Sequence, residues 1–380
     1  MSTKKRTMVY ADNAATTKLD IDAFEAMKTY LLDEYGNASQ PYSFARNPKQ
    51  ALKEAREIIA QCINAEPDEI YFTSGGTESD NWAIKGTLFA SQNKKTTITT
   101  SFEHHAVLRT CEFMERMGYP VVYINPNNKG FIETKELESI ITPDTLLVSI
   151  MMSNNEIGTI QPIKELVEIA HKNGAIFHTD AVQSVGHIPI DVKNLGVDIL
   201  SASAHKFNGP KGIGFLYIKR GTSITSLLNG GLQEHGYRAG TENIASIVGM
   251  ATALKKNCAK LEENKKDILN LENTLLNVLN EKKVSFVRNG MGERVPGNLS
   301  LSFPGFEGET VLHRLDLMGI QVSTGSACDN VNTQISHVLR AIQVDETVAL
   351  GTIRISFGKD NTIDDAKKIA LAIYKITKKQ

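Results

Sequence analysis

Short apolar runs alternate with amphipathic stretches over roughly the first two thirds of the chain, from about residue 47 to 257. Thr145–Met151 is a continuous apolar run, typical of a strand buried on both faces. A predicted helix follows, opened by Pro162 and closed by Gly174, with its apolar residues on one face. This alternation of strands and helices predicts an α/β fold with a mainly parallel sheet covered by helices on both faces.

The pattern changes after about residue 258. Apolar residues at helical spacing from Ile268 to Leu279 predict a long helix, and a last helix is expected near Ile363–Thr377. Strands are predicted between them at Asn298–Phe303, Gln321–Ser323 and Thr352–Ser356. We therefore expect a smaller C-terminal α+β domain.

Three parts follow from these patterns. Residues 1–16 form an N-terminal arm that joins the small domain, residues 17–257 form the large domain, and residues 258–380 form the small one. We find no internal repeat and no long linker between them.

Composition and charge exclude several classes of protein. The 380 residues are 41% hydrophobic and 22% charged, with a net charge of −1, so no basic face for nucleic acid or an anionic membrane is expected. No apolar stretch follows the basic run Lys4–Arg6 and no run of about 18 apolar residues occurs, so neither a secretory leader nor a membrane span is expected. Four scattered cysteines, Cys62, Cys111, Cys258 and Cys328, fit neither a disulfide framework nor a structural zinc site. These features predict a cytoplasmic protein.

Lys206 is the most informative residue of the chain. It ends a strand of small residues, beside Ser203 and His205, and a Gly/Pro-rich turn follows it. A lysine so placed can form a Schiff base with an aldehyde cofactor, while its polar neighbours hold the phosphate of that cofactor. The alternative from this segment alone is a solvated lysine before a turn.

The turn Ser74–Ser79 lies between a predicted strand and a predicted helix. Its glycines, Gly75 and Gly76, allow backbone N–H groups to approach an anion at the helix N-terminus, so a phosphate site is one interpretation. The other is a capped helix start, with Thr77 at the cap or in the first turn.

Polar side chains also follow three other strands, where ligands gather in open α/β sheets. His104 can stack on a flat ring or shuttle a proton, or it can be a satisfied surface histidine. Asn155 lies in a polar loop that binds substrate or simply forms a turn. Asp180 either pairs with a cation, such as a pyridinium nitrogen, or caps a helix.

Two candidates come from the C-terminal third. Cys328 lies in a loop of small and polar residues, as expected of a nucleophile, although an inert surface thiol is the alternative. Arg354, between strand residues, can present its fork to a carboxylate or simply charge a sheet edge. The polar loop Arg238–Asn243 has no evident internal use and indicates a subunit boundary.

The order and spacing of these segments resemble the cysteine desulfurases of the NifS/IscS-like branch, within the class V aminotransferases of the fold type I enzymes that use pyridoxal 5′-phosphate (PLP). The resemblance runs over nearly the whole chain and rests on Tyr10–Thr17, Ser74–Ser79, His104, Asn154–Gly158, Asp180–Gln183, Ser203–Tyr217, Arg238–Asn243, Gly325–Cys328, Ser336–Leu339 and Arg354. It implies a large domain with a seven-stranded sheet and a homodimer.

The resemblance also implies roles for single residues. Lys206 would hold PLP covalently, Asp180 would pair with the ring nitrogen, and Gln183 would hydrogen bond to the ring hydroxyl. His104 would stack on the ring and assist proton transfer. The phosphate would be bound by Gly76, Thr77, Ser203, His205 and, from the partner subunit, Thr241. The substrate carboxylate would be held by Asn155 and Arg354.

The implied reaction converts L-cysteine to L-alanine and leaves the sulfur as a persulfide on Cys328, for transfer to an acceptor or an Fe–S scaffold protein. No intrinsic metal is expected, although Cys328 could ligate an Fe–S cluster together with a scaffold. The alternatives are a selenocysteine lyase, another class V aminotransferase-like enzyme, or a PLP-holding protein that mainly docks a scaffold. The chain departs from the usual family pattern at Asp329, Asn330, Ile335 and Leu232, which bears on the acceptor rather than on the catalytic groups.

Overall fold

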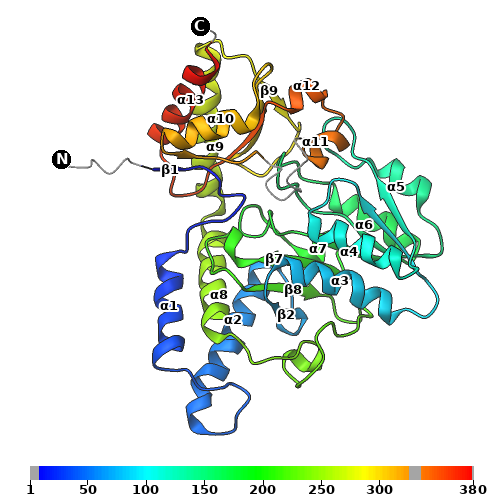
Figure 1. Cartoon of the computed structure of the whole chain (residues 1–380). Coiled ribbons are helices and arrows are strands. Elements are labelled where there is room, and N and C mark those ends of the chain that lie inside the picture. Colours follow the sequence, from blue (N-terminus) through cyan, green and yellow to red (C-terminus); the bar gives the residue numbers. More distant parts are fainter. Residues whose placement is uncertain (1–7, 325–334, 379–380) are drawn as a thin grey trace.

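The computed structural model describes residues 8–324 and 335–378. A seven-stranded sheet forms its centre (Figure 1). The strand order is β2 (Ile70–Thr73), β8 (Gly214–Ile218), β7 (Ile199–Ser203), β6 (Ile176–Asp180), β5 (Thr145–Ser149), β3 (Thr96–Thr100) and β4 (Val121–Ile124). Strand β8 is antiparallel to both of its neighbours, and the other pairs are parallel. The predicted mainly parallel, seven-stranded sheet is confirmed.

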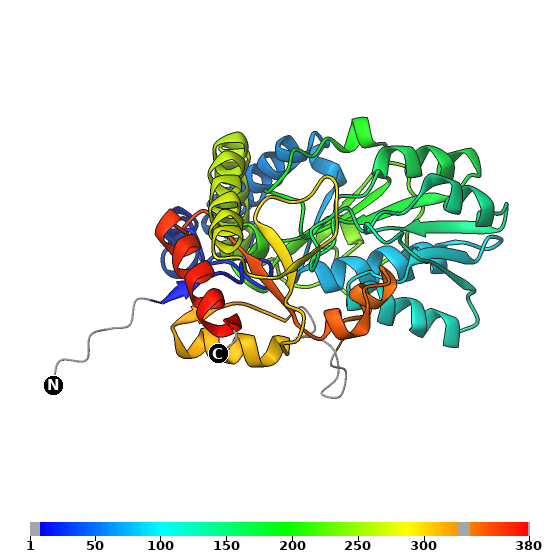
Figure 2. The same cartoon turned by 90° about the horizontal axis from the view of Figure 1, so that it is seen from above.

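Helices cover both faces of this sheet (Figure 2). On one face lie α3 (Gly76–Ala90) and α4 (His105–Arg116), which bury residues such as Ile84 and Val107 against the sheet. On the other lie α2 (Arg46–Ile63), α6 (Ile163–Lys172) and α8 (Ile244–Ala259), which contribute Leu166 and Leu254 to the main core. Strands buried on both faces carry the near-continuous apolar runs read from the sequence.

The remaining helices of this region lie at its periphery or in its connections. They are α1 (Ile21–Leu32), α5 (Thr134–Ile140), α7 (Val192–Leu195) and the 3-10 turns η1 (Ser43–Ala45), η2 (Pro67–Glu69), η3 (Ala204–Lys206) and η4 (Glu234–Gly236).

The C-terminal part has its own sheet and core. Strands β9 (Val287–Asn289), β10 (Asn298–Ser302) and β12 (Thr352–Ser356) form an antiparallel sheet. It packs with α9 (Leu261–Glu281), α10 (Gly308–Leu317) and α13 (Ile363–Thr377) in a separate apolar cluster. Two short helices, α11 (His337–Ala341) and α12 (Glu346–Ala349), precede β12.

The N-terminal strand β1 (Val9–Tyr10) pairs in parallel with β11 (Ile320–Gln321). This pairing places the N-terminal arm on the C-terminal part, and we retain the three-part division at residues 16 and 257 as a proposal. The two apolar clusters do not divide at residue 257, because Ile335, Val338 and Leu339 of the C-terminal part belong to the main core. The predicted strand Gln321–Ser323 starts one residue and ends two residues beyond β11, and its last residue, Ser323, forms an isolated bridge with Arg354 instead. Strand β9 was not predicted, since it is short and Val287 is largely exposed.

None of the helices in the described ranges combines the length and apolar character needed to cross a lipid bilayer.

Candidate active site

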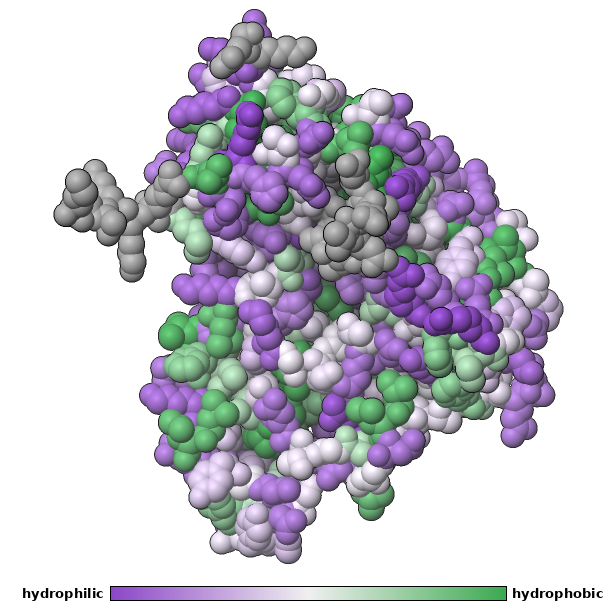
Figure 3. Space-filling model, in the orientation of Figure 1, coloured by the Kyte–Doolittle hydropathy of each residue, from purple (hydrophilic) through white to green (hydrophobic). Residues whose placement is uncertain are grey.

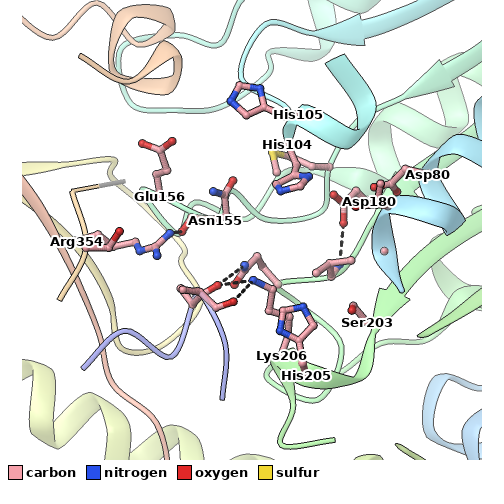
Figure 4. Close-up of a pocket in the computed structure, with 18 of the residues that line it drawn as sticks. Asp80, His104, His105, Asn155, Glu156, Asp180, Ser203, His205, Lys206 and Arg354 are labelled. Carbon is pink, nitrogen blue, oxygen red and sulfur yellow. Dashed lines mark hydrogen bonds between the residues drawn. The ribbon is translucent and has the colours of Figure 1, made fainter. Parts of the chain in front are cut away.

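A cavity of about 350 Å³ opens at the carboxyl ends of the central parallel strands. Strands β6 and β7 and helices α3 and α4 bring residues to it, and the N-terminal arm and the C-terminal part close it (Figure 4). The predicted site residues that line it are Gly76, Thr77, His104, Asn155, Asp180, Gln183, Ser203, His205, Lys206 and Arg354. Ten positions, read from separate segments, therefore meet in one place.

Two predicted residues are not among them. Thr241 is exposed and does not line the cavity of its own chain. Cys328 lies outside the described residues, together with the rest of segment 325–334. On either side of that segment, Ser323 and His337 do line the cavity.

Lys206 ends the turn η3, directly after β7. Its Nζ donates to the backbone oxygens of Ala14 at 2.6 Å and Ala15 at 2.9 Å, so the N-terminal arm holds the amine (Figure 4). Gln183 donates to the Ala14 oxygen as well, at 3.0 Å. The role of these two alanines was missed, because a backbone carbonyl leaves no signal in the sequence.

Asp180 ends β6, with its side chain 5% exposed. One carboxyl oxygen accepts the N–H of Val182 at 2.9 Å. Burial raises the pKa of Asp180, while this hydrogen bond and the charge of Lys206 oppose the rise. The carboxyl therefore caps a turn and not a helix, so the alternative reading of a helix cap is wrong, and the side chain lines the cavity.

His104 is the N-cap of α4, and its Nδ1 accepts the N–H of Ala106 at 3.1 Å. Burial, and then the charge of Lys206, lowers the pKa of His104 to about 4. The ring is therefore neutral at pH 7, with its proton on Nε2, because Nδ1 is an acceptor. A neutral flat ring is suited to stacking.

The glycine turn before α3 forms one end of the cavity. Gly75 has a φ of 147°, which only glycine adopts readily, and a Cβ on Gly76 would lie 2.7 Å from the Val182 side chain. Ser203 and His205 face this turn across the cavity. Backbone N–H groups at the start of a 15-residue helix, with hydroxyl and imidazole groups opposite, are a favourable anion site.

Arg354 lies at the other end, 6% exposed. It donates to Asp12 Oδ1 at 2.8 Å and to the backbone oxygen of Asn155 at 3.0 Å, while its buried Nε has no hydrogen-bond partner among the described residues. A buried donor without a partner is costly, so this group is positioned to receive a ligand carboxylate. Asp12 was missed as a site residue because its partner lies 342 residues away.

The cavity therefore combines an anion site at the glycine turn, the flat ring of His104, the Asp180 carboxyl close to that ring and the amine of Lys206. The model of the aminotransferase class V family matches residues 9–369 of this chain. The chain belongs to the class V aminotransferase family. This membership confirms the predicted fold type and PLP as the cofactor. The cavity fits PLP, because it offers an anion site for the phosphate, a flat ring at His104, an acid at Asp180 and an amine at Lys206.

Individual relatives narrow the class of enzyme. A cysteine desulfurase, IscS, from Methanosarcina thermophila is 46% identical over 372 residues, which cover 98% of this chain and 92% of the relative. A solved structure named NifS-like protein is 38% identical with a TM-score of 0.92, covering 97% of this chain and 99% of that one. A second, SspA in complex with cysteine, is 36% identical with a TM-score of 0.83 and coverages of 93% and 100%. The predicted resemblance to cysteine desulfurases is confirmed.

Proposed function

We propose that this protein is a PLP-dependent cysteine desulfurase, which converts L-cysteine to L-alanine and keeps the sulfur as a persulfide on Cys328. The observation that carries the proposal is the meeting of Lys206, Asp180, His104 and Arg354 in one cavity. Relatives named cysteine desulfurase at 46% identity support the choice of reaction.

Several residues would hold the cofactor. Lys206 would bind it covalently, Asp180 would face the ring nitrogen, His104 would stack on the ring and Gln183 would reach the ring hydroxyl. The turn at Gly76 and Thr77, with Ser203 and His205, would bind the phosphate. When bound, PLP supplies an electron sink for the substrate Cα.

The other steps belong to the chain itself. Arg354 and Asn155 would fix the substrate carboxylate, and the Lys206 amine would take the Cα proton. The Cys328 thiolate would attack the substrate sulfur, the carbon–sulfur bond would break, and a proton would return to the carbon to give alanine. The balance is one cysteine and one enzyme thiol in, one alanine and one enzyme persulfide out. Ser323 and His337, which precede and follow Cys328 in the sequence among the described residues, both line the cavity.

A product assay tests the reaction. With L-cysteine and a reducing thiol, the purified protein should release alanine and sulfide in equal amounts and no keto acid. Keto-acid formation would favour another class V aminotransferase, and a much larger kcat/KM for selenocysteine would favour a lyase. Absence of turnover with every acceptor would favour a docking protein.

Asp12→Asn should raise KM for cysteine about tenfold and change kcat less, because a charged partner would no longer hold the Arg354 fork in place. Steady-state kinetics measure this, with Arg354→Lys expected to raise KM further. A fall in kcat at unchanged KM would contradict this role of Asp12.

We further propose that the enzyme is a homodimer in which Thr241 reaches the phosphate site of the partner. A second opening of about 330 Å³ leaves the anion end of the cavity uncovered in the single chain. Thr241 is exposed, and so are apolar side chains along and after α1, where Figure 3 shows apolar surface; they are Ile21, Phe24, Leu31, Leu32 and Tyr35. A second chain would cover such a surface.

Complementation between two variants tests Thr241 in trans. Thr241→Ala should weaken PLP binding about tenfold, and Lys206→Ala should be inactive. Co-expressed as a hybrid dimer, the two variants should regain one normal site, with about half the activity of the wild-type dimer at limiting PLP. No gain over the Thr241→Ala homodimer would place Thr241 in its own site, and a monomer in sedimentation would exclude the dimer.

The sulfur would pass to an acceptor or Fe–S scaffold protein. We also propose that the protein acts in the cytoplasm, because its four scattered cysteines do not form a disulfide framework. Label transferred from Cys328 to a purified candidate acceptor would test the first point.

A further inference from the structure

Asp80 is a buried acid that lines the cavity, and the proposed reaction does not use it. It lies on α3, one turn after the glycine turn, and is 1% exposed. One carboxyl oxygen, Oδ1, has no hydrogen-bond partner among the described residues. Side-chain atoms of Asp80, Asp180 and His104 lie within 4.8 Å of one another (Figure 4). Asp80 therefore belongs to the immediate surroundings of Asp180.

His178 does not neutralise Asp80, although its Nε2 lies 3.6 Å from Oδ1. Both ring nitrogens already hydrogen bond to hydroxyls, Nδ1 to Ser149 at 2.8 Å and Nε2 to Ser201 at 3.0 Å. Burial lowers the pKa of His178 to about 3, so the imidazole is neutral at pH 7. Because the imidazole carries no charge, the short distance is not an ion pair.

Besides the neutral rings of His104 and His178, the titratable groups that face Asp80 from other elements are acids. Asp180 comes from β6, and Glu103 follows β3, with its Oε1 held by Thr100 and Met151. Among the described residues no lysine or arginine forms an ion pair with Asp80; Lys206 acts on Asp180 instead. Burial first, and then the negative charge of Asp180, raises the pKa of Asp80 well above its usual range, although the Ser201 hydroxyl opposes the rise. Burial raises the pKa of Glu103 to about 8.

We infer that Asp80 is a positioning residue that carries a proton, so that the Asp80–Asp180 pair holds a single negative charge, on Asp180. Two neighbouring buried carboxyls cannot both ionise cheaply, and Asp180 is the one favoured by the Val182 N–H and by Lys206. The inference rests on the proposal that Asp180 faces the ring nitrogen of PLP.

This arrangement gives the cofactor one counter-charge. A metal cation is the other group that Asp80, His104 and Asp180 together could bind. The pyridinium nitrogen of PLP, in contrast, carries one positive charge, which one carboxylate neutralises. A second ionised acid would leave an unpaired buried charge, which is costly. A neutral Asp80 would place hydrogen-bonding groups within 4.8 Å of the Asp180 carboxylate and would help to position it without adding a second charge.

Three variants test the inference through the PLP dissociation constant between pH 6 and 9, measured by equilibrium dialysis. Asp180→Asn should weaken PLP binding about 100-fold, since it removes the charge. Asp80→Asn should stay within about threefold of the wild type, because an amide replaces a neutral acid of the same shape. Asp80→Ala should lose about tenfold, because it removes the hydrogen-bonding groups.

Infrared spectra of the PLP-loaded protein give an independent readout should Asp80→Ala not fold. At pH 7.5 the wild type should show protonated-carboxyl bands from both Asp80 and Glu103. Asp80→Asn should remove the Asp80 band. Glu103→Gln should remove only the Glu103 band and leave the Asp80 band in place. A loss of about 100-fold in both Asp80 variants would mean that Asp80 is charged, and no loss in either would mean that it is a bystander; each overturns the inference. Unchanged PLP binding in Asp180→Asn would overturn a different statement, the proposed pairing of Asp180 with the ring nitrogen of PLP, on which the inference about Asp80 rests.

Discussion

Replacing Cys328 with alanine is expected to abolish the formation of alanine from cysteine while PLP stays bound. No other thiol among the described residues lines the cavity, since Cys62, Cys111 and Cys258 lie in or beside helix-packing cores. Without a nucleophile to take the sulfur, the carbon–sulfur bond has no route to break. Loss of a nucleophile of this kind lowers kcat by at least about a thousandfold.

Alanine release and the absorbance of bound PLP, measured on the same sample, check this result. Cys258→Ala is a matched control, because it removes a partly buried thiol that packs against the main core and does not line the cavity. This variant should keep most of the activity. Full turnover in Cys328→Ala would reject the nucleophile.

Lys206→Ala should lose both the covalent attachment of PLP and all measurable desulfurase activity. Lys206 is the lysine that lines the cavity in the described residues, and the carbonyls of Ala14 and Ala15 hold its amine there. The variant lacks the group that binds the cofactor and the base that takes the Cα proton, so two separate contributions vanish together.

Borohydride treatment followed by mass spectrometry measures the attachment, since reduction fixes PLP to its lysine. The wild type should carry the label on Lys206 and the variant should carry none. Lys219→Ala, whose side chain is half exposed and lies 3.8 Å from Asp198, serves as the control and should keep label and activity. Label on another lysine in the wild type would overturn the assignment.

Much of the fold could be predicted, because it depends on local pattern. The helix Ile363–Thr377 follows directly from its apolar spacing and has the bounds expected. The buried strands β5 and β6 show their apolar runs, and polar residues at their ends mark the cavity. Strand β9 could not be predicted, because it has only three residues and its one apolar side chain, Val287, is exposed.

The candidate site was predictable where a strand end or a helix start produces a signal, as at Lys206, Asp180 and Gly76. It was not predictable where the contact depends on the closed fold. The pairing of Asp12 with Arg354 and the capture of Lys206 by Ala14 join residues 342 and 192 positions apart. Asp80 could not be predicted for the same reason, since it comes to lie beside Asp180 only when α3 packs on the sheet.

The central claim is that the sulfur of cysteine is transferred to Cys328. Its most direct test is mass spectrometry of the protein after mixing with L-cysteine, without a reducing thiol and followed by alkylation. We expect one additional sulfur atom on the Cys328 peptide, formed together with one alanine, and none in Lys206→Ala. Alanine formed without added sulfur on that peptide, or with the sulfur on Cys62, Cys111 or Cys258, would contradict it.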